Sequence, residues 1–295
     1  MAEEIVEKCR LCGTKVTVFR KALQADQYQA VIGVKEDSRT WYTCRFCELY
    51  SQTNCLTDEQ VKQSYLRYRD AEIRSEDVET TFNTLVNLPE DERENEVRWG
   101  MFCTEIQNQA VNITDIGSGI GIWPMSLVES GFPNVKCIEP EPNSAKFINT
   151  KLNIPCHSGF YEPGLYDKAD VVTLIHVLEH MRDPLSFLRS IKANDLVLGG
   201  LLFLEVPDPV AISHLVNNIG DHDDFNSLHF WSFSVMALER MLRMAKFRPF
   251  VTRRVHYEKR NLYRIIMLCE SLDPEGPGYR AKGHKGRYKK ASRVR

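Results

Sequence analysis

The sequence predicts an α/β fold with a doubly wound parallel sheet of seven strands, and three observations support this prediction. From residue 111 onward, apolar runs of strand length alternate with segments of helical periodicity. That alternation is typical of a parallel sheet covered by helices on both faces. A turn with three glycines, Gly117, Gly119 and Gly121, follows the first run, where such sheets bind their ligands. Paired cysteine knuckles near the N-terminus indicate a second, smaller module.

The expected elements follow in order from the apolar runs. Candidate strands occupy residues 111–116, 134–139, 153–157, 169–176, 201–206, 250–257 and 263–270. Helices are expected between most of these strands, notably after Ile122, Pro142, Asp183 and Ser232.

Composition limits the class of protein. With 295 residues, 43% hydrophobic and 26% charged, the chain is long enough for one large core plus a small module. No apolar run approaches the roughly 20 residues of a membrane span, and the acidic N-terminus differs from a secretory signal. We therefore expect a cytoplasmic protein. In that compartment its nine cysteines are thiols, metal ligands or buried apolar residues rather than disulfides.

Composition shifts divide the chain into residues 1–57, a small module; 58–110, a helical connector; 111–270, the sheet domain; and 271–295, a basic tail. The formal net charge is −2, but residues 280–295 carry eight Lys or Arg and no acid. The remainder is therefore acidic. Such a tail buries too little apolar surface to offset its ordering entropy, so we expect disorder. It could attract phosphate-bearing partners or only increase solubility.

The small module contains two C-x2-C knuckles, Cys9 with Cys12 and Cys44 with Cys47, separated by short β-type runs. Each knuckle points two thiolates at one ion, and four sulfur ligands complete a tetrahedral zinc site. The spacing predicts a zinc ribbon with structural zinc, because four sulfur ligands leave no position for water or substrate. Unliganded thiols, an Fe–S cluster and a redox-active pair remain alternatives, and Cys55 could replace one ligand.

The connector, residues 58–110, is strongly charged and has apolar residues at helical spacing. Thr57 or Asp58 is the expected N-cap of its first helix. Tyr65 and Tyr68 could face a substrate, although aromatic residues on such a helix more often serve packing.

Two carboxylates near the glycine turn indicate the ligand. Asp115 ends the first strand and Glu139 ends the second. An acid beside the turn would repel a pyrophosphate but suits an ammonium group, whereas Glu139 can accept hydrogen bonds from both ribose hydroxyls. The turn also departs from the dinucleotide fingerprint, since Ile122 occupies its third glycine position. A nucleoside with a cationic amino-acid tail, S-adenosylmethionine, fits these features.

Three motifs together, "DIGSGIG", "IEPEP" and "DVVTLIHVLEHMRDP", resemble those of class I S-adenosylmethionine-dependent methyltransferases. The chain is most similar to the group that has an N-terminal zinc-binding module and modifies sugars, glycans or small metabolites. The resemblance covers nearly the whole chain and implies a seven-stranded Rossmann-like methyltransferase sheet, preceded by the zinc ribbon and connecting helices.

The resemblance also implies residue roles. The three glycines would line the methionine part of the cofactor, Asp115 would hold its amino group, and Glu139 would bind the ribose. His157, Gly159 or Phe160 would border the adenine. His176, at the tip of the fourth strand, would approach the methionine and the transferring methyl group.

The stretch "HVLEH" contains His176, Glu179 and His180. Helical i to i+4 spacing would place both histidines on one face, which also suits a metal ion. With no third ligand apparent nearby, Glu179 and His180 are expected to shape the loop beside the cofactor.

A hydroxyl or carbon acceptor must lose a proton, so a general base is expected. The candidates are His176, His229, His222, Glu205 and Asp208. His229 is the first choice, because the pKa of histidine is near neutral. In the sugar C-methyltransferases that the chain resembles, a Glu-His pair occurs here, but Leu228 stands in the Glu position. This departure disfavours C-methylation.

The expected function is O-methylation of a hydroxyl on a sugar, surface glycan or related small metabolite. C- or N-methylation of a nucleotide-linked sugar is the first alternative. A nucleic-acid or protein methyltransferase that docks through the ribbon and tail is the second. It is less favoured, because no Asn-Pro-Pro-Tyr-type motif follows the fourth strand and the body is acidic. The expected cofactors are S-adenosylmethionine and structural Zn²⁺; the sequence gives no prediction of oligomeric state.

Overall fold

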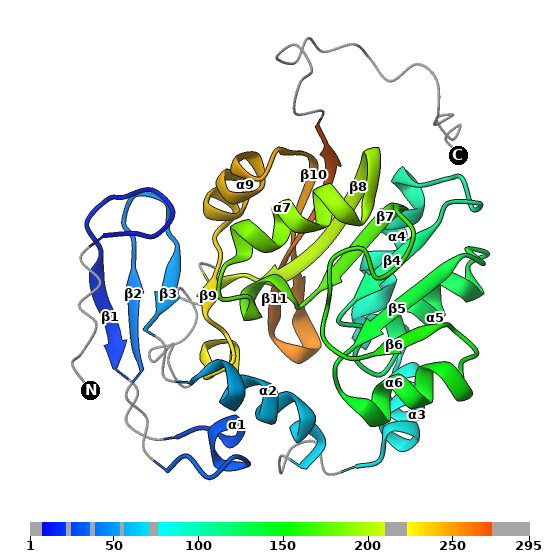
Figure 1. Ribbon diagram of the computed structural model, residues 1–295, viewed down its shortest axis with the longest axis horizontal. Helices are drawn as coiled ribbons and strands as arrows, with labels where there is room; N and C mark the ends of the chain where they lie inside the picture. Colours follow the sequence, from blue (N-terminus) through cyan, green and yellow to red (C-terminus); the bar gives the residue numbers. More distant parts are fainter. Residues whose placement is uncertain are drawn as a thin grey trace.

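A seven-stranded sheet forms the centre of the protein (Figure 1). The computed structural model describes residues 8–21, 25–35, 39–53, 56–70, 76–209 and 223–272. In sheet order the strands are β10 (Phe247–Tyr257), β11 (Leu262–Ser271), β8 (Leu196–Pro207), β7 (Ala169–Ile175), β4 (Ile113–Ile116), β5 (Val135–Glu139) and β6 (Cys156–Ser158). All seven predicted strands are present, and the predicted α/β fold class is confirmed.

The sheet is mixed rather than entirely parallel. Strands β4 to β8 pair in parallel, whereas β11 lies antiparallel between β8 and β10. The reason is the short connection η7 (Glu258–Arg260), which ends at Asn261 in the left-handed region, with φ +49°. A parallel neighbour needs a crossover of a dozen or more residues, so this turn can only return the chain antiparallel.

Helices cover both faces of the sheet. Helices α4 (Glu94–Glu105), α5 (Ile122–Glu129) and α6 (Pro142–Thr150) contribute to the core on one face, and α7 (Pro184–Asn194) and α9 (Val235–Met244) to the core on the other. The strands supply both cores by alternation: in β8, Phe203 belongs to the first core and Leu204 to the second. This three-layer arrangement is the predicted doubly wound architecture.

The predicted connector contains helices, but its last helix packs into the main core. Its elements are α2 (Asp58–Leu66), η1 (Tyr68–Asp70), α3 (Val78–Val86), η3 (Glu90–Glu92) and α4. Of the two expected N-caps, Thr57 is the one used, in a capping box with Gln60. Phe102 of α4 is fully buried against Trp123 and Phe203. Helix α4 therefore packs with the sheet.

The N-terminal module shares a sheet with a late part of the chain. Its four strands lie in the order β1 (Thr17–Lys21), β2 (Thr40–Thr43), β3 (Tyr50–Gln52) and β9 (Trp231–Ser232), with α1 (Gln27–Ala30) between β1 and β2. In Figure 1 this module lies beside α9. Its buried Leu11, Tyr42 and Leu49 belong to the same core cluster as α7 and α9. The module is thus packed onto the sheet domain.

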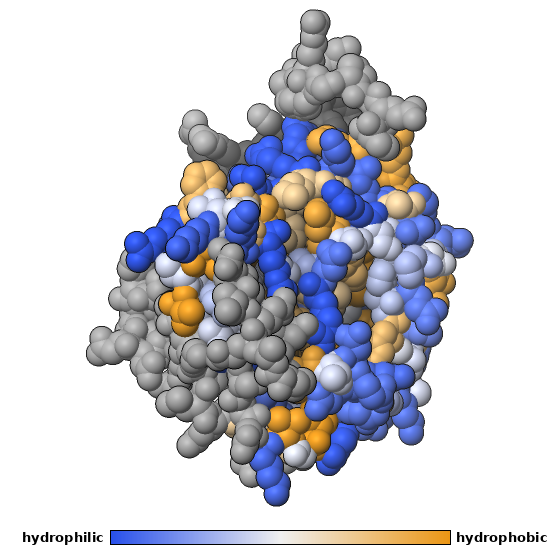
Figure 2. All heavy atoms as spheres, turned by 60° about the vertical axis from the view of Figure 1, so that its left-hand side comes forward, coloured by the Kyte–Doolittle hydropathy of each residue, from blue (hydrophilic) through white to orange (hydrophobic). Residues whose placement is uncertain are grey.

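The face that carries the N-terminal module is mainly hydrophilic where its residues are described, with separate hydrophobic areas (Figure 2). No helix among the described residues is both long and apolar enough to cross a membrane. Cys55, His222 and residues 273–295 of the predicted tail (271–295) lie outside the described residues, whereas Ser271 ends β11.

Candidate functional site

The candidate site lies at the point where the chain changes direction across the sheet. From β4 the chain runs outward to β5 and β6, then returns to β7 and β8 on the other side. The carboxyl ends of β4 and β7 therefore open into a crevice. A cavity of about 1100 Å³ lies here, lined by the glycine turn, strand-tip carboxylates, histidines and tyrosines. This volume is at the upper end of small-molecule sites, so it can hold a cofactor and an acceptor together.

Two glycines of the turn are required by its backbone. Gly117 has φ +75°, and a Cβ there would lie 2.6 Å from Cγ2 of Val177. Gly121 is the N-cap of α5 with φ +87°, and its Cβ would lie 2.6 Å from Cδ1 of Leu152. A side chain at either position would be strained and would clash. Of the three predicted glycines, Gly117 and Gly119 line the cavity, whereas Gly121 is outside its lining.

Asp115, at the carboxyl end of β4, is 1% exposed and lines the cavity. The hydroxyl of Thr173 donates to its Oδ1 at 2.5 Å. Burial raises the pKa of Asp115 to about 6, against the opposing hydrogen bonds of Thr173 and Ser118. The hydrogen bonds do not fully offset the cost of burying the charged carboxylate, so a cationic ligand would stabilise its ionised form.

Glu139, at the carboxyl end of β5, is also buried and lines the cavity. The backbone N–H of Gly119 donates to its Oε2 at 2.6 Å, and that of Glu141 donates to its Oε1 at 2.8 Å. Burial raises the pKa of Glu139 to about 8, although these two hydrogen bonds oppose the rise. Each oxygen retains a lone pair for a further donor, such as a ribose hydroxyl.

His176 follows β7 and has φ +56°, in the left-handed region. Its Nδ1 lies 3.2 Å from Oε1 of Glu179, and its Nε2 lies 3.0 Å from Oε1 of Glu205. Burial and the charge of Arg264 lower the pKa of His176, but hydrogen bonds to the two glutamates outweigh them and raise it to about 9. With both ring nitrogens facing carboxylates, this imidazole is held protonated, so it is unsuited to the predicted role of proton acceptor.

Glu205 is completely buried on β8. Nε and Nη2 of Arg98 donate to its Oε2 and Oε1 at 2.8 and 2.5 Å. Burial tends to raise the pKa of Glu205, but the charge and hydrogen bonds of Arg98, helped by His176, hold it well below its usual range. A carboxylate paired in this way is a poor proton acceptor, which argues against its predicted role as general base.

Two more histidines, His180 and His229, line the cavity with ring centroids 4.6 Å apart. Nδ1 of His180 lies 3.0 Å from the carbonyl oxygen of Leu228, and Nδ1 of His229 lies 2.8 Å from that of Asp224. Because a carbonyl only accepts, we assign the proton of each ring to Nδ1, which leaves the lone pair on Nε2. Burial lowers the pKa of His180 to about 3 and of His229 to about 4.

The N-terminal module holds the loop that carries His229. Nε2 of Gln52, on β3, donates to the carbonyl oxygen of His229 at 2.5 Å and to that of Ser227 at 3.2 Å. Asp26 accepts the backbone N–H and the hydroxyl of Ser227 at 2.5 and 2.8 Å. The position of His229 therefore depends on two residues that lie far earlier in the chain.

A wall of aromatic side chains closes one part of the cavity. Tyr28 stacks on Tyr68, with centroids 5.5 Å apart, and Tyr65 meets Phe160 edge-on at 5.9 Å. Tyr65 also contacts His180 edge-on at 5.9 Å. All five residues line the cavity. Tyr65 and Tyr68 therefore serve packing and face the site at once, two roles that the sequence treats as alternatives.

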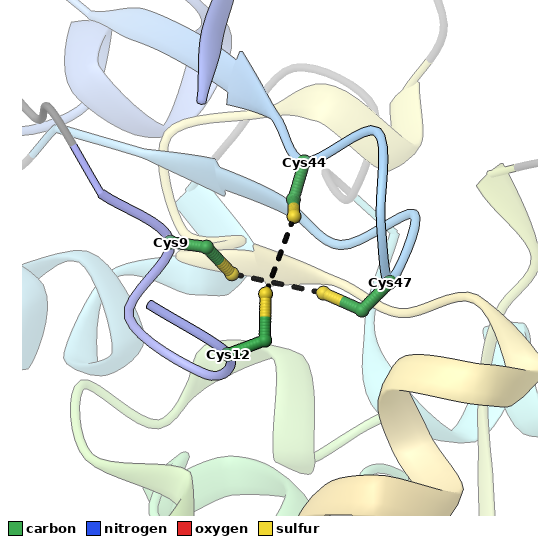
Figure 3. A group of neighbouring side chains, drawn as sticks. All are labelled: Cys9, Cys12, Cys44 and Cys47. Carbon is green, nitrogen blue, oxygen red and sulfur yellow. Dashed lines mark hydrogen bonds between the residues drawn. The ribbon is translucent and has the colours of Figure 1, made fainter. Parts of the chain in front are cut away.

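The four knuckle cysteines come together in the N-terminal module (Figure 3). Sγ of Cys9 lies 3.6 Å from that of Cys47, Sγ of Cys12 lies 3.4 Å from that of Cys44, and all four sulfurs lie within 4.8 Å of one another. None of the four forms a disulfide bond.

The two knuckles have the same backbone hydrogen bonds. The N–H of Gly13 donates to the carbonyl of Cys9 at 2.9 Å, and the N–H of Glu48 donates to that of Cys44 at 2.8 Å. Both closing residues have positive φ, +73° for Gly13 and +53° for Glu48. A non-glycine residue rarely adopts this conformation, so Glu48 indicates a turn that its surroundings hold in place.

Several predicted residues lie elsewhere. Phe160 lines the cavity, but His157 and Gly159 are not part of its lining. Asp208 faces a separate groove of about 720 Å³ and accepts a hydrogen bond from Nε of Arg254 at 2.6 Å. The i to i+4 expectation for "HVLEH" is wrong, because His176 follows a strand and His180 ends the short 3-10 helix η4 (Leu178–His180).

The sequence analysis missed Arg98, Glu94, Arg264 and Asp224, which line the cavity together. Nη2 of Arg98 contacts Glu94 at 2.8 Å, and Nη1 of Arg264 contacts Asp224 at 3.4 Å. An i to i+4 pair was visible for Glu94 and Arg98. No local pattern distinguishes Arg264 from the other charges of its strand.

The profile of a family described as a methyltransferase domain matches residues 76–249, more than half of the chain. The chain belongs to this methyltransferase family. With the doubly wound sheet and its cavity at the switch point, the match confirms the predicted enzyme class, a class I S-adenosylmethionine-dependent methyltransferase. No curated protein matches the methyltransferase in sequence.

Two crystal structures are similar to this methyltransferase in fold. One is the 1,6-didemethyltoxoflavin-N1-methyltransferase of Burkholderia thailandensis, which has S-adenosylhomocysteine bound; it is 15% identical, with a TM-score of 0.52, over 78% of this chain and 97% of that one. The other is the 4+2 cyclase SpnF, 13% identical with a TM-score of 0.53, over 75% of this chain and 98% of that one. At such identity the likeness shows the fold alone.

Proposed function

We propose that this methyltransferase transfers a methyl group from S-adenosylmethionine to a hydroxyl group of a sugar, a surface glycan or a related small metabolite. One observation carries the proposal: a single cavity joins two buried strand-tip carboxylates to a pair of histidines and a wall of tyrosines. The carboxylates suit the donor, whereas the histidines and tyrosines suit a neutral, hydroxyl-bearing acceptor.

The donor half of the cavity uses the glycine turn and both carboxylates. Asp115 binds the ammonium group of the methionine tail, because opposite charges stabilise each other strongly in a buried site. Glu139 accepts hydrogen bonds from the ribose hydroxyls, and Gly117, Gly119 and Gly121 let the methionine part approach the backbone. Phe160 borders the adenine. A protein of similar fold has S-adenosylhomocysteine bound, which is consistent with a cofactor of this class.

The acceptor half is formed by the histidine pair and the tyrosines of the aromatic wall. Tyrosine rings present an apolar face together with a polar hydroxyl, which suits the apolar face and hydroxyl rim of a sugar ring. His229 is held by Asp224, Gln52 and the strand pairing of β9, so its ring is positioned before an acceptor arrives. We place the reacting hydroxyl beside the unprotonated Nε2 atoms of His180 and His229.

Methyl transfer is an in-line displacement at a sulfonium, so the protein must align the two substrates and remove the acceptor proton. Glu205 and His176 are occupied in the ion pair with Arg98 and in contacts with each other. We assign them to positioning, since together they link α4, β8 and the residue that follows β7. The proton is lost at the histidine pair, with His229 as the first candidate.

We further propose that Cys9, Cys12, Cys44 and Cys47 bind structural zinc. Four converging thiols from two turns with matching hydrogen bonds support this assignment. In this role the ion orders the N-terminal module, which in turn holds the His229 loop, and takes no part in methyl transfer.

The experiment that tests the proposed function measures S-adenosylhomocysteine release with sugar nucleotides, lipopolysaccharide fragments, small phenols and tRNA as acceptors. We expect turnover with a hydroxyl-bearing sugar and a product whose added methyl is on oxygen by mass spectrometry and NMR. Asp115→Asn serves as the background control, because it should lose donor binding. Methylation of carbon or nitrogen, or turnover with tRNA alone, would overturn the proposal.

A further inference from the structure

Three potential ligand groups converge in the acceptor half of the cavity. One ring nitrogen each of His180 and His229 and one carboxylate oxygen of Glu179 lie within 4.8 Å of one another. His180 and Glu179 belong to η4, and His229 comes from the loop before β9. This third residue is the ligand that sequence spacing could not supply for "HVLEH".

The hydrogen bonds of the two histidines leave one nitrogen of each ring available for a metal ion. Each Nδ1 donates to a backbone carbonyl, Leu228 for His180 and Asp224 for His229. Each Nε2 therefore carries a lone pair, and neither has a hydrogen-bond partner among the described residues. A carbonyl that accepts from the far nitrogen is the usual way in which proteins orient a metal-binding imidazole.

Glu179 supplies an independent observation. Its side chain is fully buried, and Oε1 contacts His176. Oε2 is buried without a hydrogen-bond partner among the described residues. A buried, unpaired carboxylate oxygen costs free energy, so its presence on a residue of this cluster needs an explanation. Three electron-pair donors gathered this closely repel one another, and a cation bound between them would remove this repulsion.

A second cluster, formed by Glu94, His176 and Glu205, does not contain unpaired donor atoms of this kind. Both oxygens of Glu205 accept hydrogen bonds from Arg98, and both nitrogens of His176 face carboxylates. The positive charges of Arg98 and of the imidazole already neutralise its carboxylates. A metal ion there would have to displace them.

We propose that Glu179, His180 and His229 bind a divalent metal ion of the zinc class, and that this ion receives the acceptor hydroxyl. Two imidazoles and one carboxylate suit zinc and its transition-metal neighbours, whereas magnesium prefers oxygen ligands throughout. Three protein ligands leave a position open for a substrate oxygen. The inference rests on the proposed function, because it supplies the means of deprotonating a hydroxyl.

The reaction then proceeds with defined atoms and charges. The ion lowers the pKa of the hydroxyl bound to it, and the proton passes to a water molecule. The alkoxide oxygen forms the bond to the methyl carbon, while the bond between sulfur and methyl breaks. The electron pair of that bond stays on sulfur, so the sulfonium becomes the neutral thioether of S-adenosylhomocysteine. In this mechanism His229 acts as a ligand rather than as a free base.

The test is the zinc content of the full-length protein after dialysis against Zn²⁺ and gel filtration. We expect two zinc ions per chain in the wild type, because the cysteine site holds the other. Glu179→Gln and His229→Gln should each lose one equivalent, and Cys44→Ser should lose at least the ion of the cysteine site. His157→Gln is the matched control: its imidazole lies outside the cavity lining, so it should keep two. Two ions retained in Glu179→Gln and His229→Gln would overturn the proposal.

Circular dichroism identifies variants that fail to fold. If they do, titration of the wild type with Co²⁺ decides whether the second metal site exists. Binding of a second Co²⁺ ion that adds no thiolate-to-metal charge-transfer band supports the site. If only one Co²⁺ ion binds, the proposal is overturned. The outcomes also separate the two proposals. Hydroxyl methylation without a second metal ion overturns the metal site and leaves His229 as base. A second metal ion with no hydroxyl acceptor overturns the proposed function.

Discussion

The ionisation of Glu139 should make nucleoside binding depend on pH. Its pKa is about 8, against an ordinary value of 4.5, because the carboxyl group is buried. That difference corresponds to about 5 kcal/mol. Since the pKa is raised, the stabilising contribution is complete below pH 4.5 and is lost as the pH rises through about 8. The cofactor-free protein should therefore become less stable as the pH rises from about 4.5 to about 8, and its stability should level off above that.

Ribose hydroxyls stabilise the ionised form of Glu139, because they donate hydrogen bonds to its carboxylate. The N–H groups of Gly119 and Glu141 already donate to the same carboxylate. Binding then requires loss of the proton on Glu139 at any pH below about 8. The affinity should increase about tenfold per pH unit in that range and level off above it. Glu139→Gln should bind about 1.5–3 kcal/mol more weakly at high pH, about ten- to a hundredfold.

Calorimetry with methylthioadenosine between pH 6.5 and 9 is the appropriate assay. This nucleoside has the ribose and adenine of the cofactor but no amino-acid tail, so the ammonium group and Asp115 do not contribute. Asp115→Asn is the control and should keep the pH dependence. An affinity that is independent of pH in the wild type, or an equal pH dependence in Glu139→Gln, would refute the reasoning.

Four other changes test the remaining parts of the structure. Cys44→Ser should release one zinc ion and lower the melting temperature, as measured by metal analysis and thermal denaturation. Phe102→Ala should destabilise the protein by about 3–5 kcal/mol in urea, since it empties a completely buried site. Glu205→Gln should return the pKa of His176 toward its usual range, visible by NMR, because one of its two carboxylate partners disappears. Deletion of residues 280–295 should leave turnover and its salt dependence unchanged; a steep loss with salt in the intact chain alone would favour a polyanionic acceptor.

The strands and the glycine turn could be predicted because their signals are local. An apolar run of strand length, followed by glycines, describes β4 and its turn without reference to any distant residue. Asp115 and Glu139 were found for the same reason, since each is the last residue or nearly the last residue of its strand. Parallel strands bring such tips to one edge, so adjacency in the site followed from the topology alone.

The acceptor half and the ion pairs near it could not be predicted in this way, because their contacts join distant segments. Arg98 pairs with Glu205 across 107 residues, and Glu179 and His229 meet from η4 and the loop before β9. The helical interpretation of "HVLEH" failed because His176 takes a left-handed conformation directly after β7. His176 turns the chain before a helix begins. The i to i+4 spacing of His176 and His180 in the sequence therefore does not place them on one face of a helix.

The packing of the N-terminal module gives the cysteine cluster a second consequence. Ser234, the N-cap of α9, donates its hydroxyl to the carbonyl of Cys47 at 2.7 Å, and β3 pairs with β9. On the same strand β3, Gln52 holds the carbonyl of His229. Disorder at the knuckles would therefore loosen the acceptor loop while leaving the tips of β4 and β5 intact. Loss of zinc should consequently raise the KM for the acceptor far more than the Kd for the cofactor.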